Sequence, residues 1–293
     1  MSRQQTVLIT GATAGIGRRT ALYLWERGFH VIATGRRASA LDELSLEAGK
    51  DRFSTLVLDV TDPDAITNAK GFVDQVTDGY GLDVLVNNAA YGQGGPLELV
   101  PDDMLRRQFD TNVFGLMAVV RAFLPAMRER GSGRIINISS IAGKLVAPFL
   151  GVYDSTKFAI EGLSDALRRE LRPFGVLVVL VEPGAIRTDF DVIERKGIRA
   201  HCGPGSPYRA YLDPFISWHK RIHRNAPDPL VVARTIERAI TARRPRSRYV
   251  TPLSARILLL LNGLLPTSWM DALIGHIVGM GGDKHLDERR NQD

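Results

Sequence analysis

The chain has 293 residues, of which 44% are hydrophobic and 24% charged, and it carries a net charge of +6. This size and composition suit a single large α/β domain spanning 1–293 and argue against a low-complexity chain. No apolar stretch reaches the roughly 18 residues that cross a bilayer, and no signal sequence opens the chain, so we expect a cytoplasmic protein. No nucleic-acid-binding module accompanies the positive charge, so we expect no nucleic-acid partner. The one cysteine, Cys202, cannot form an internal disulfide, and we expect it to be a plain loop residue.

A strand, a glycine-rich turn and a helix open the chain. Thr6 to Thr10 is a short apolar run typical of a strand, and a helical pattern follows from Arg18 to Arg27. Gly11 permits a tight turn, Gly15 lets the backbone approach a pyrophosphate, and Gly17 lets the helix pack closely on the strand. The residues that we expect to contact a dinucleotide here are Gly11, Thr13, Ala14, Gly15, Ile16 and Gly17. The alternative is a glycine-rich turn without a ligand.

The end of the second predicted strand, His30 to Thr34, indicates which dinucleotide binds. An NAD-binding protein usually carries an acidic residue there for the ribose 2′-hydroxyl, whereas this chain has Gly35. The missing carboxylate removes repulsion against a 2′-phosphate, and Arg36 and Arg37 supply forked cationic donors for it. We therefore expect NADP(H) as the cofactor. The alternative is a solvated basic turn.

The third and fourth predicted strands end in polar residues that suit the same ligand. Asp59 and Val60 follow the third strand, where Asp59 could accept from the adenine amino group or only cap the next turn. Asn87, Asn88 and Ala89 follow the fourth strand. The side-chain amides of the two asparagines could bond the backbone of the neighbouring strand ends and form a shelf beneath the cofactor.

Tyr153 and Lys157 are separated by just over one helical turn, so a helix would place them on one face. A fixed ammonium beside a phenol favours phenolate and lowers the pKa of the tyrosine from near 10, which suits acid-base catalysis. An ordinary exposed contact is the alternative.

Two further polar positions accompany this pair. We predict one long helix from Pro101 to Arg130 with Asn112 in its middle, as an exposed amide or as the holder of a water on a proton path. A fifth strand, Gly133 to Ile138, delivers Ser139 and Ser140 to the edge of the sheet where ligands bind.

Together these motifs resemble the classical short-chain dehydrogenase/reductase family from about Thr6 to Thr188. The resemblance implies a doubly wound parallel sheet of the Rossmann type, with helices on both faces, and hydride transfer between C4 of the nicotinamide and a carbonyl carbon. It selects Ser140, thirteen residues before the tyrosine, to hold the substrate oxygen. In this family the tyrosine, here Tyr153, donates or takes the hydroxyl proton. Lys157 would lower the pKa of that tyrosine and hold the nicotinamide ribose, and Asn112 would position a water that links Lys157 to solvent. The remaining cofactor contacts that the resemblance implies fall on Pro183, Gly184, Ile186 and Thr188.

The segment 189–229 is rich in aromatic residues, and we predict that it is irregular. The resemblance implies that it covers the active site. An apolar cover suits a lipophilic alcohol, ketone or aldehyde of steroid, retinoid or fatty type. His219 and His223 have the spacing of a helical metal pair, but we expect a solvated basic helix and no metal. The alternative function is that of a non-catalytic NADP(H)-sensing regulatory protein.

The C-terminal extension, 253–293, carries an apolar surface broader than one core-facing stripe. Its members are Leu253, Ile257, Leu260, Leu261, Leu264 and Leu265. Because an arginine cluster, Arg243 to Arg248, comes just before it, this surface could meet the edge of a membrane. We expect instead that it packs on its own domain or on a partner subunit of a homo-oligomer.

Overall fold

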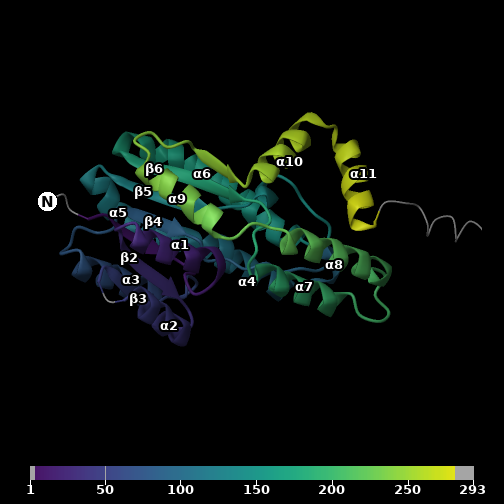
Figure 1. Cartoon of the computed structure of the whole chain (residues 1–293), viewed down its shortest axis with the longest axis horizontal. Helices are drawn as coiled ribbons and strands as arrows, with labels where there is room; N and C mark the ends of the chain where they lie inside the picture. Colours follow the sequence, from purple (N-terminus) through teal and green to yellow (C-terminus); the bar gives the residue numbers. More distant parts are fainter. Residues whose placement is uncertain (1–3, 50, 281–293) are drawn as a thin grey trace, which may run out of the picture.

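The computed structural model describes residues 4–49 and 51–280, and these residues form a parallel sheet in the order β3-β2-β1-β4-β5-β6-β7 (Figure 1). The strands are β1 (Thr6–Ile9), β2 (His30–Gly35), β3 (Phe53–Val57), β4 (Val84–Asn87), β5 (Gly133–Ile138), β6 (Val176–Pro183) and β7 (Arg248–Thr251). The strand order reverses direction between β1 and β4. Ligands of open α/β sheets bind beside the carboxyl ends of strands at such a switch point.

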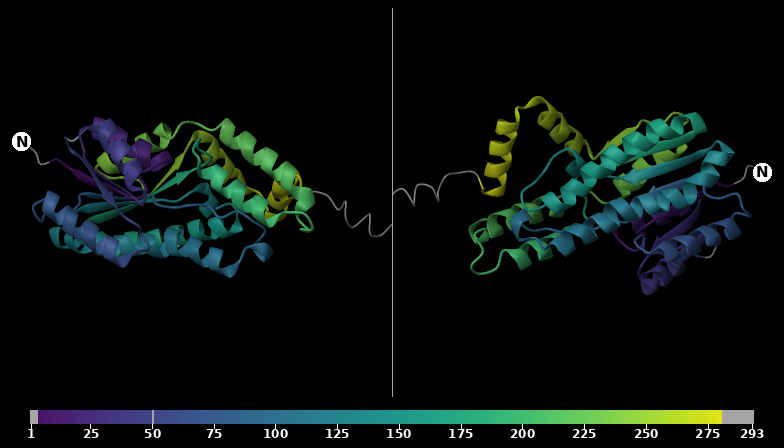
Figure 2. Two further views of the ribbon diagram at one scale, coloured as in Figure 1. Left: turned by 90° about the horizontal axis from the view of Figure 1, so that it is seen from below. Right: turned by 180° about the vertical axis from the view of Figure 1, so that it is seen from behind.

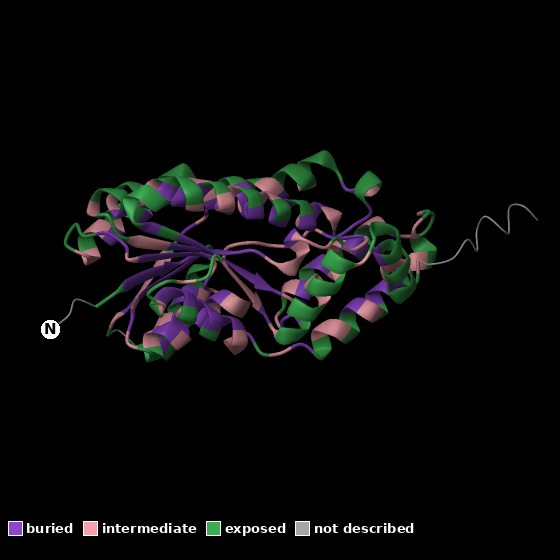
Figure 3. Ribbon diagram, turned by 90° about the horizontal axis from the view of Figure 1, so that it is seen from above, coloured by how far each residue is buried: buried purple, intermediate pink, exposed green. Residues whose placement is uncertain are grey.

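Alternating side chains divide the core into two layers, which confirms the predicted doubly wound sheet. In β1, Val7 and Ile9 pack on one face, while Leu8 packs on the other. One face is covered by α1 (Gly15–Glu26), α2 (Ala38–Ala48) and α9 (Leu230–Thr241), the other by α3 (Pro63–Val76), α5 (Leu116–Arg130) and α6 (Gly151–Leu171). Figures 2 and 3 show this sandwich, with buried strands between helices that are exposed on their outer sides. Short 3₁₀ turns lie at Leu97–Leu99, Ile141–Gly143 and Arg172–Phe174.

The predicted helix from Pro101 to Arg130 is not one regular helix. It comprises α4 (Asp102–Phe109), a π-helical turn at Asp110–Gly115, and α5. Gly115 lies so close to the end of β3 that a Cβ on it would be 2.8 Å from the carbonyl oxygen of Val60. The wider turn carries Asn112 into the interior, where it is 1% exposed, instead of leaving it on a helix surface.

The run Asp102–Arg130 is also the one helix of the described residues that is long and apolar enough to cross a membrane. Its C-terminal half buries Val119, Val120, Phe123 and Met127 against the sheet. The run is therefore apolar because it packs into the core on that side.

The segment 189–229 is helical, which corrects the expectation of an irregular segment. It forms α7 (Phe190–His201) and α8 (Arg209–Arg224), which lie beyond the carboxyl ends of the strands (Figure 1). Apolar residues at helical spacing, including Ile198 and Phe215, bury themselves in a separate small core with Phe149. Cys202 follows the last residue of α7 and is fully buried in the same core.

Two C-terminal helices, α10 (Leu253–Leu264) and α11 (Thr267–Val278), extend away from the sheet (Figures 1 and 2). Only a few of their side chains, such as Met270 and Val278, are buried. Leu260 and Leu264 are 62% and 70% exposed, so packing on the same domain does not account for them. The rest of the predicted extension, 281–293, lies outside the described residues.

Candidate active site

The glycine turn before α1 is shaped to receive an anion. Gly11 and Gly15 have φ of +68° and +53°, which strain any residue with a side chain. A Cβ on Gly17 would lie 2.3 Å from the carbonyl oxygen of Gly11, so the helix could not start so close to the strand with any other residue. In this described turn, no side chain caps α1 and its first turn has no acidic residue. Its N–H groups therefore suit the pyrophosphate of a dinucleotide.

The amides after β4 hold this turn in place, as the sequence predicted. Asn88 Nδ2 donates to the carbonyl oxygens of Thr10 (3.0 Å) and Gly11 (3.1 Å). Thr10 Oγ1 accepts from the N–H groups of Asn88 and Ala89, both at 3.0 Å. Asn87 Nδ2 donates to Asn137 Oδ1 at 2.9 Å, which joins β4 to β5. These bonds fix the ends of three adjacent strands beneath the expected cofactor position.

Gly35 is confined by the glycine turn. A Cβ on Gly35 would be 2.6 Å from Thr13 Cγ2, so this position excludes the acidic side chain that an NAD-binding protein usually carries there. Arg36 and Arg37 follow directly, and Arg36 is 70% exposed. Arg37 Nη2 lies 3.5 Å from the carbonyl oxygen of Thr13, so Arg37 borders the turn.

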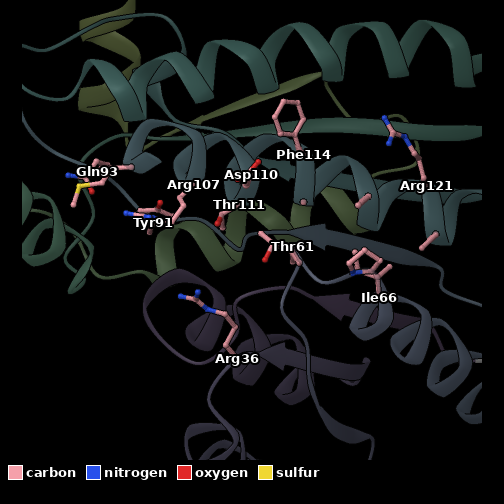
Figure 4. Close-up of a pocket in the computed structure, with 16 residues that line it drawn as sticks. Arg36, Thr61, Ile66, Tyr91, Gln93, Arg107, Asp110, Thr111, Phe114 and Arg121 are labelled. Carbon is pink, nitrogen blue, oxygen red and sulfur yellow. The ribbon is translucent and has the colours of Figure 1, made fainter. Parts of the chain in front are cut away.

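Asp59 caps its own turn and also faces Arg36. Its Oδ1 accepts from the N–H and the hydroxyl of Thr61, at 2.9 and 2.8 Å, and its Oδ2 is 3.9 Å from Arg36 Nη1. Arg36, Val60 and Thr61 line one side of a groove of about 960 Å³, while Tyr91 lines another part of it (Figure 4). That Asp59 and Val60 contact the adenine of the cofactor stays a prediction.

The chain from Pro183 to Thr188 connects the end of β6 to α7 across the glycine turn. Thr188 lies against Gly15, where its Cγ2 would be 3.3 Å from an added Cβ. Gly184 N donates to the carbonyl oxygen of Thr251 at 2.8 Å, and Ile186 is buried. Of these predicted cofactor residues, Thr188 borders the glycine turn, and the carbonyl oxygen of Pro183 lies beside the hydroxyl of Ser140.

The predicted catalytic side chains converge from α6 and β5. Ser140 follows β5, and its hydroxyl is 3.3 Å from the carbonyl oxygen of Pro183. Lys157 is 3% exposed, and its Nζ donates to the carbonyl oxygen of Ile138 at 2.8 Å. The same Nζ lies 5.6 Å from the centre of the Tyr153 ring. Burial lowers the pKa of Lys157 to about 8.

The pKa of Tyr153 is raised, which contradicts the expectation that Lys157 would lower it. Burial is the largest cause, the charge of Glu194 raises the pKa further, and a hydrogen bond with Ser140 opposes both. The cation lies beside the ring but donates to Ile138, so in the protein alone desolvation of the phenolate prevails. Tyr153 is therefore a neutral phenol, able to donate a proton, at neutral pH.

Asn112 joins the loop after β4 to α6. Its Nδ2 donates to the carbonyl oxygen of Tyr91 (3.0 Å) and to Thr156 Oγ1 (3.1 Å), and its Oδ1 accepts from the N–H of Tyr91 (3.2 Å). The side chain thus spans two elements of the site from the π-helical turn. That it also positions a water stays a prediction.

Sequence reasoning expected the segment 189–229 to cover the site, but it missed that α7 brings Glu194 there. The Phe190 ring lies 5.3 Å from the Tyr153 ring, centre to centre. One turn later, Glu194 is 3% exposed, and burial raises its pKa to about 8. Its Oε2 is 3.1 Å from His219 Nε2. The four-residue spacing of Phe190 and Glu194 would have indicated a shared face if the segment had been predicted as a helix.

The two histidines of α8 are not on a solvated face, which corrects that expectation. His219 is 1% exposed, and burial lowers the pKa of both His219 and His223 to about 4. Possible ligand atoms of Asp191, His219 and His223 lie within 4.8 Å of one another. Asp191 is already ion-paired with Arg195, however, and that guanidinium opposes a second cation at the same place. We therefore assign no metal to these residues.

Proteins of similar sequence include several oxidoreductases. A sequence model described as short chain dehydrogenase matches residues 5–198. Retinol dehydrogenase 5 of Homo sapiens is 36% identical over 284 residues, covering 92% of this chain and 87% of that protein. A 3-ketodihydrosphingosine reductase of Bacteroides thetaiotaomicron is 38% identical, covering 83% of this chain and 86% of that protein. An NADPH-dependent 3-dehydrocapnine reductase of Ornithobacterium rhinotracheale is 34% identical, with the same coverage.

Solved structures give the same picture. A short-chain dehydrogenase from Streptomyces avermitilis superposes with a TM-score of 0.77 at 34% identity, over 97% of this chain and 100% of that chain. A serine dehydrogenase complexed with NADP⁺ superposes with a TM-score of 0.73 at 30% identity, over 85% of this chain and 96% of that chain.

Proposed function

The chain belongs to the short-chain dehydrogenase/reductase family, and from this premise we propose that it reduces a lipophilic ketone or aldehyde with NADPH. Its reaction class follows from the family. It is an oxidoreductase that uses NAD(P)(H) and acts on CH–OH groups. The cofactor preference, the direction and the substrate class are the proposed part.

The raised pKa of the Tyr153 phenol is the observation that favours reduction. When bound, the cofactor supplies the hydride. Tyr153 Oη, kept protonated by burial, donates its proton to the substrate oxygen as the carbonyl becomes a hydroxyl. The hydroxyl of Ser140 holds that oxygen, and Lys157 provides a cation beside the tyrosine. Asn112 fixes the loop above the sheet to the helix that carries the tyrosine.

The corner at the end of β2 supports NADPH over NADH. Thr13 leaves no room for an acidic side chain at Gly35, so no carboxylate there repels a 2′-phosphate. Arg36 is largely exposed beside the groove and its ion pair with Asp59 is long, at 3.9 Å, so it can turn toward an anion (Figure 4). Relatives named for NADPH or bound to NADP⁺ share this fold.

The cover formed by α7 and α8 supports a lipophilic substrate. Phe190 faces the catalytic tyrosine, and Phe215 and Phe149 pack edge to face 5.0 Å apart behind it. The relatives named retinol dehydrogenase and 3-ketodihydrosphingosine reductase point in the same direction.

Absorbance of NADPH, followed with a panel of retinoid aldehydes, steroid ketones and long-chain ketones, tests the proposal. We expect turnover with a long-chain or retinoid carbonyl that Tyr153→Phe eliminates. If the wild type oxidises NADPH with none of them while binding it tightly, the chain is the NADP(H)-sensing regulatory protein instead.

We also propose that this is a cytoplasmic protein whose α10 and α11 rest on a membrane surface. Leu253, Leu264 and Trp269 are each more than three-fifths exposed. An apolar helical face of this kind suits the boundary between headgroups and acyl chains. Arg248 of the predicted arginine cluster turns inward, however, to Glu161 and Asp165. Apolar contact is therefore the main attraction, and a homo-oligomer that covers the same leucines is the competing outcome.

A further inference from the structure

Glu194 is a buried carboxylate beside the catalytic tyrosine that the proposed mechanism does not use. It lies one helical turn after Phe190, whose ring contacts the ring of Tyr153. Its negative charge is close enough to Tyr153 to raise the pKa of the phenol. The carboxylate is therefore part of the surroundings of the reacting group, although it comes from the covering helix.

The loop after β4 approaches so closely that Glu194 lies between elements of the site. A Cβ on Gly92 would be 2.6 Å from both Cγ and Oε1 of Glu194, and 2.9 Å from Cε1 of Phe190. Gly92 follows the loop residue Tyr91, which Asn112 holds. The absence of a side chain at Gly92 thus leaves the space in which the carboxylate sits.

The charge of Glu194 has no cationic partner among the described residues. Its hydrogen-bond partner is His219, whose pKa burial lowers to about 4, so the imidazole is neutral and donates from Nε2. Arg195, the nearest arginine along α7, is ion-paired with Asp191. A buried carboxylate without a cation is unfavourable, so Glu194 either takes up a proton or receives a cation from a ligand.

We propose that Glu194 binds an ammonium group of the substrate, and that the substrate is therefore a long-chain ketone with an amine close to the carbonyl. The assignment rests on the proposed function. The reaction itself is unchanged: a hydride adds to the carbonyl carbon and Tyr153 protonates the oxygen, giving a vicinal amino alcohol. His219 orients the carboxylate for the ammonium. The ammonium in turn cancels the negative charge beside Tyr153, so the amine and the reacting carbonyl are recognised together.

The test compares three ketones of one chain length with NADPH: a 2-amino-3-ketone, its N-acetyl derivative and the ketone without nitrogen. We expect the wild type to favour the amine by about tenfold or more in kcat/KM, the size of one charge-assisted bond. Glu194→Gln, nearly isosteric, should lose this preference while still reducing the neutral ketones. Asp189→Asn, which removes an exposed charge at the start of the same helix, should retain it.

Three results would overturn the assignment. If the wild type reduces all three ketones equally, or if Glu194→Gln keeps the preference, Glu194 does not bind an ammonium and the proposed reductase activity stands. If the wild type reduces none of the three nor any carbonyl of the panel above, the proposed function fails together with the assignment. NADPH binding by each variant shows that the fold is intact.

Discussion

The rings of Tyr153 and Phe190 lie edge to face, with their centres 5.3 Å apart. Because Phe190 is the first residue of α7, the first turn of the covering helix lies against the catalytic tyrosine. This contact places an apolar ring against the tyrosine, whose pKa is raised chiefly by burial. Through Phe190 and the charge of Glu194, the covering helix is therefore part of the surroundings of the reacting phenol.

Tyr153→Phe removes the proton donor but keeps the ring that packs on Phe190. We expect turnover to fall below detection, while NADPH binds within about twofold of the wild type, because the glycine turn and not the phenol holds most of the cofactor. Steady-state NADPH consumption and fluorescence titration of bound NADPH measure the two effects. Activity that survives the substitution would exclude Tyr153 as the donor.

Arg36→Ala tests whether the residues at the end of β2 select NADPH. Loss of a charge-assisted pair with the 2′-phosphate should cost about 1.5–3 kcal/mol in the preference for NADPH over NADH. The ratio of kcat/KM for the two cofactors measures this preference. Arg169→Ala, which removes an exposed arginine from α6, should leave the ratio unchanged. A wild type that prefers NADH would contradict the assignment of both Arg36 and Arg37.

Asn112→Ala tests the link between the π-helical turn and the loop after β4. It leaves the N–H and the carbonyl oxygen of Tyr91 without this partner, so the free energy of unfolding should fall by about 1–3 kcal/mol. Activity should fall too, because the loop borders the site. Urea denaturation measures the loss, with Asn68→Ala on the exposed side of α3 as the matched control. Equal stability of the two variants would mean that the three hydrogen bonds contribute little.

Much of the fold could be predicted from the sequence because local patterns specify it. An apolar run predicts a buried strand, and the glycines at positions 11, 15 and 17 predict a tight turn. The structure confirms the strand β1 and the turn that follows it. In α7 and α8 the apolar positions are mixed with charges and with Pro214, and their partner surface includes Phe149, far away in sequence. Helical periodicity was therefore hidden until the packing partner was known.

The site was predicted as a set of residues but not as an electrostatic environment. The spacing of Tyr153 and Lys157 correctly places both on α6, yet the direction of the tyrosine pKa depends on burial and on Glu194. Burial by a covering helix is a tertiary property, so the spacing could not reveal it. The same holds for Glu194, whose position beside Gly92 joins two segments about a hundred residues apart.

Glu194 also predicts a pH dependence of stability. Its pKa is about 8 in the folded protein and has an ordinary value of 4.5, so between these values the folded state binds more protons than the unfolded state. The free energy of unfolding of the wild type should therefore fall as the pH rises through this window, by at most about 1.4 kcal/mol per pH unit from this group. Glu194→Gln has no carboxyl group at this position, so its free energy of unfolding lacks this dependence on pH.

The stability difference between Glu194→Gln and the wild type should thus grow in favour of the variant from about pH 5 to about pH 8. Asp154, whose pKa is also raised to about 8, is present in both proteins; because burial is the largest cause of its shift and the charge of Glu194 a smaller one, most of its contribution cancels in the comparison. Urea denaturation in the absence of cofactor measures both curves. Parallel curves would show that Glu194 has a cationic partner in the protein.

Leu260→Glu combined with Leu264→Glu tests the outer face of α10. Both leucines are more than three-fifths exposed, so the substitutions should leave the fold and the activity on a short soluble ketone unchanged. Burial of each leucine in the lipid boundary contributes about 1.5–3 kcal/mol, so the wild type should pellet with vesicles and the variant should stay in solution. Co-sedimentation with liposomes of phosphatidylcholine and phosphatidylglycerol measures this difference. Light scattering on the same samples gives the oligomeric state. A wild type that does not pellet, together with a variant that dissociates to smaller particles, would assign this face to contact between copies of the chain.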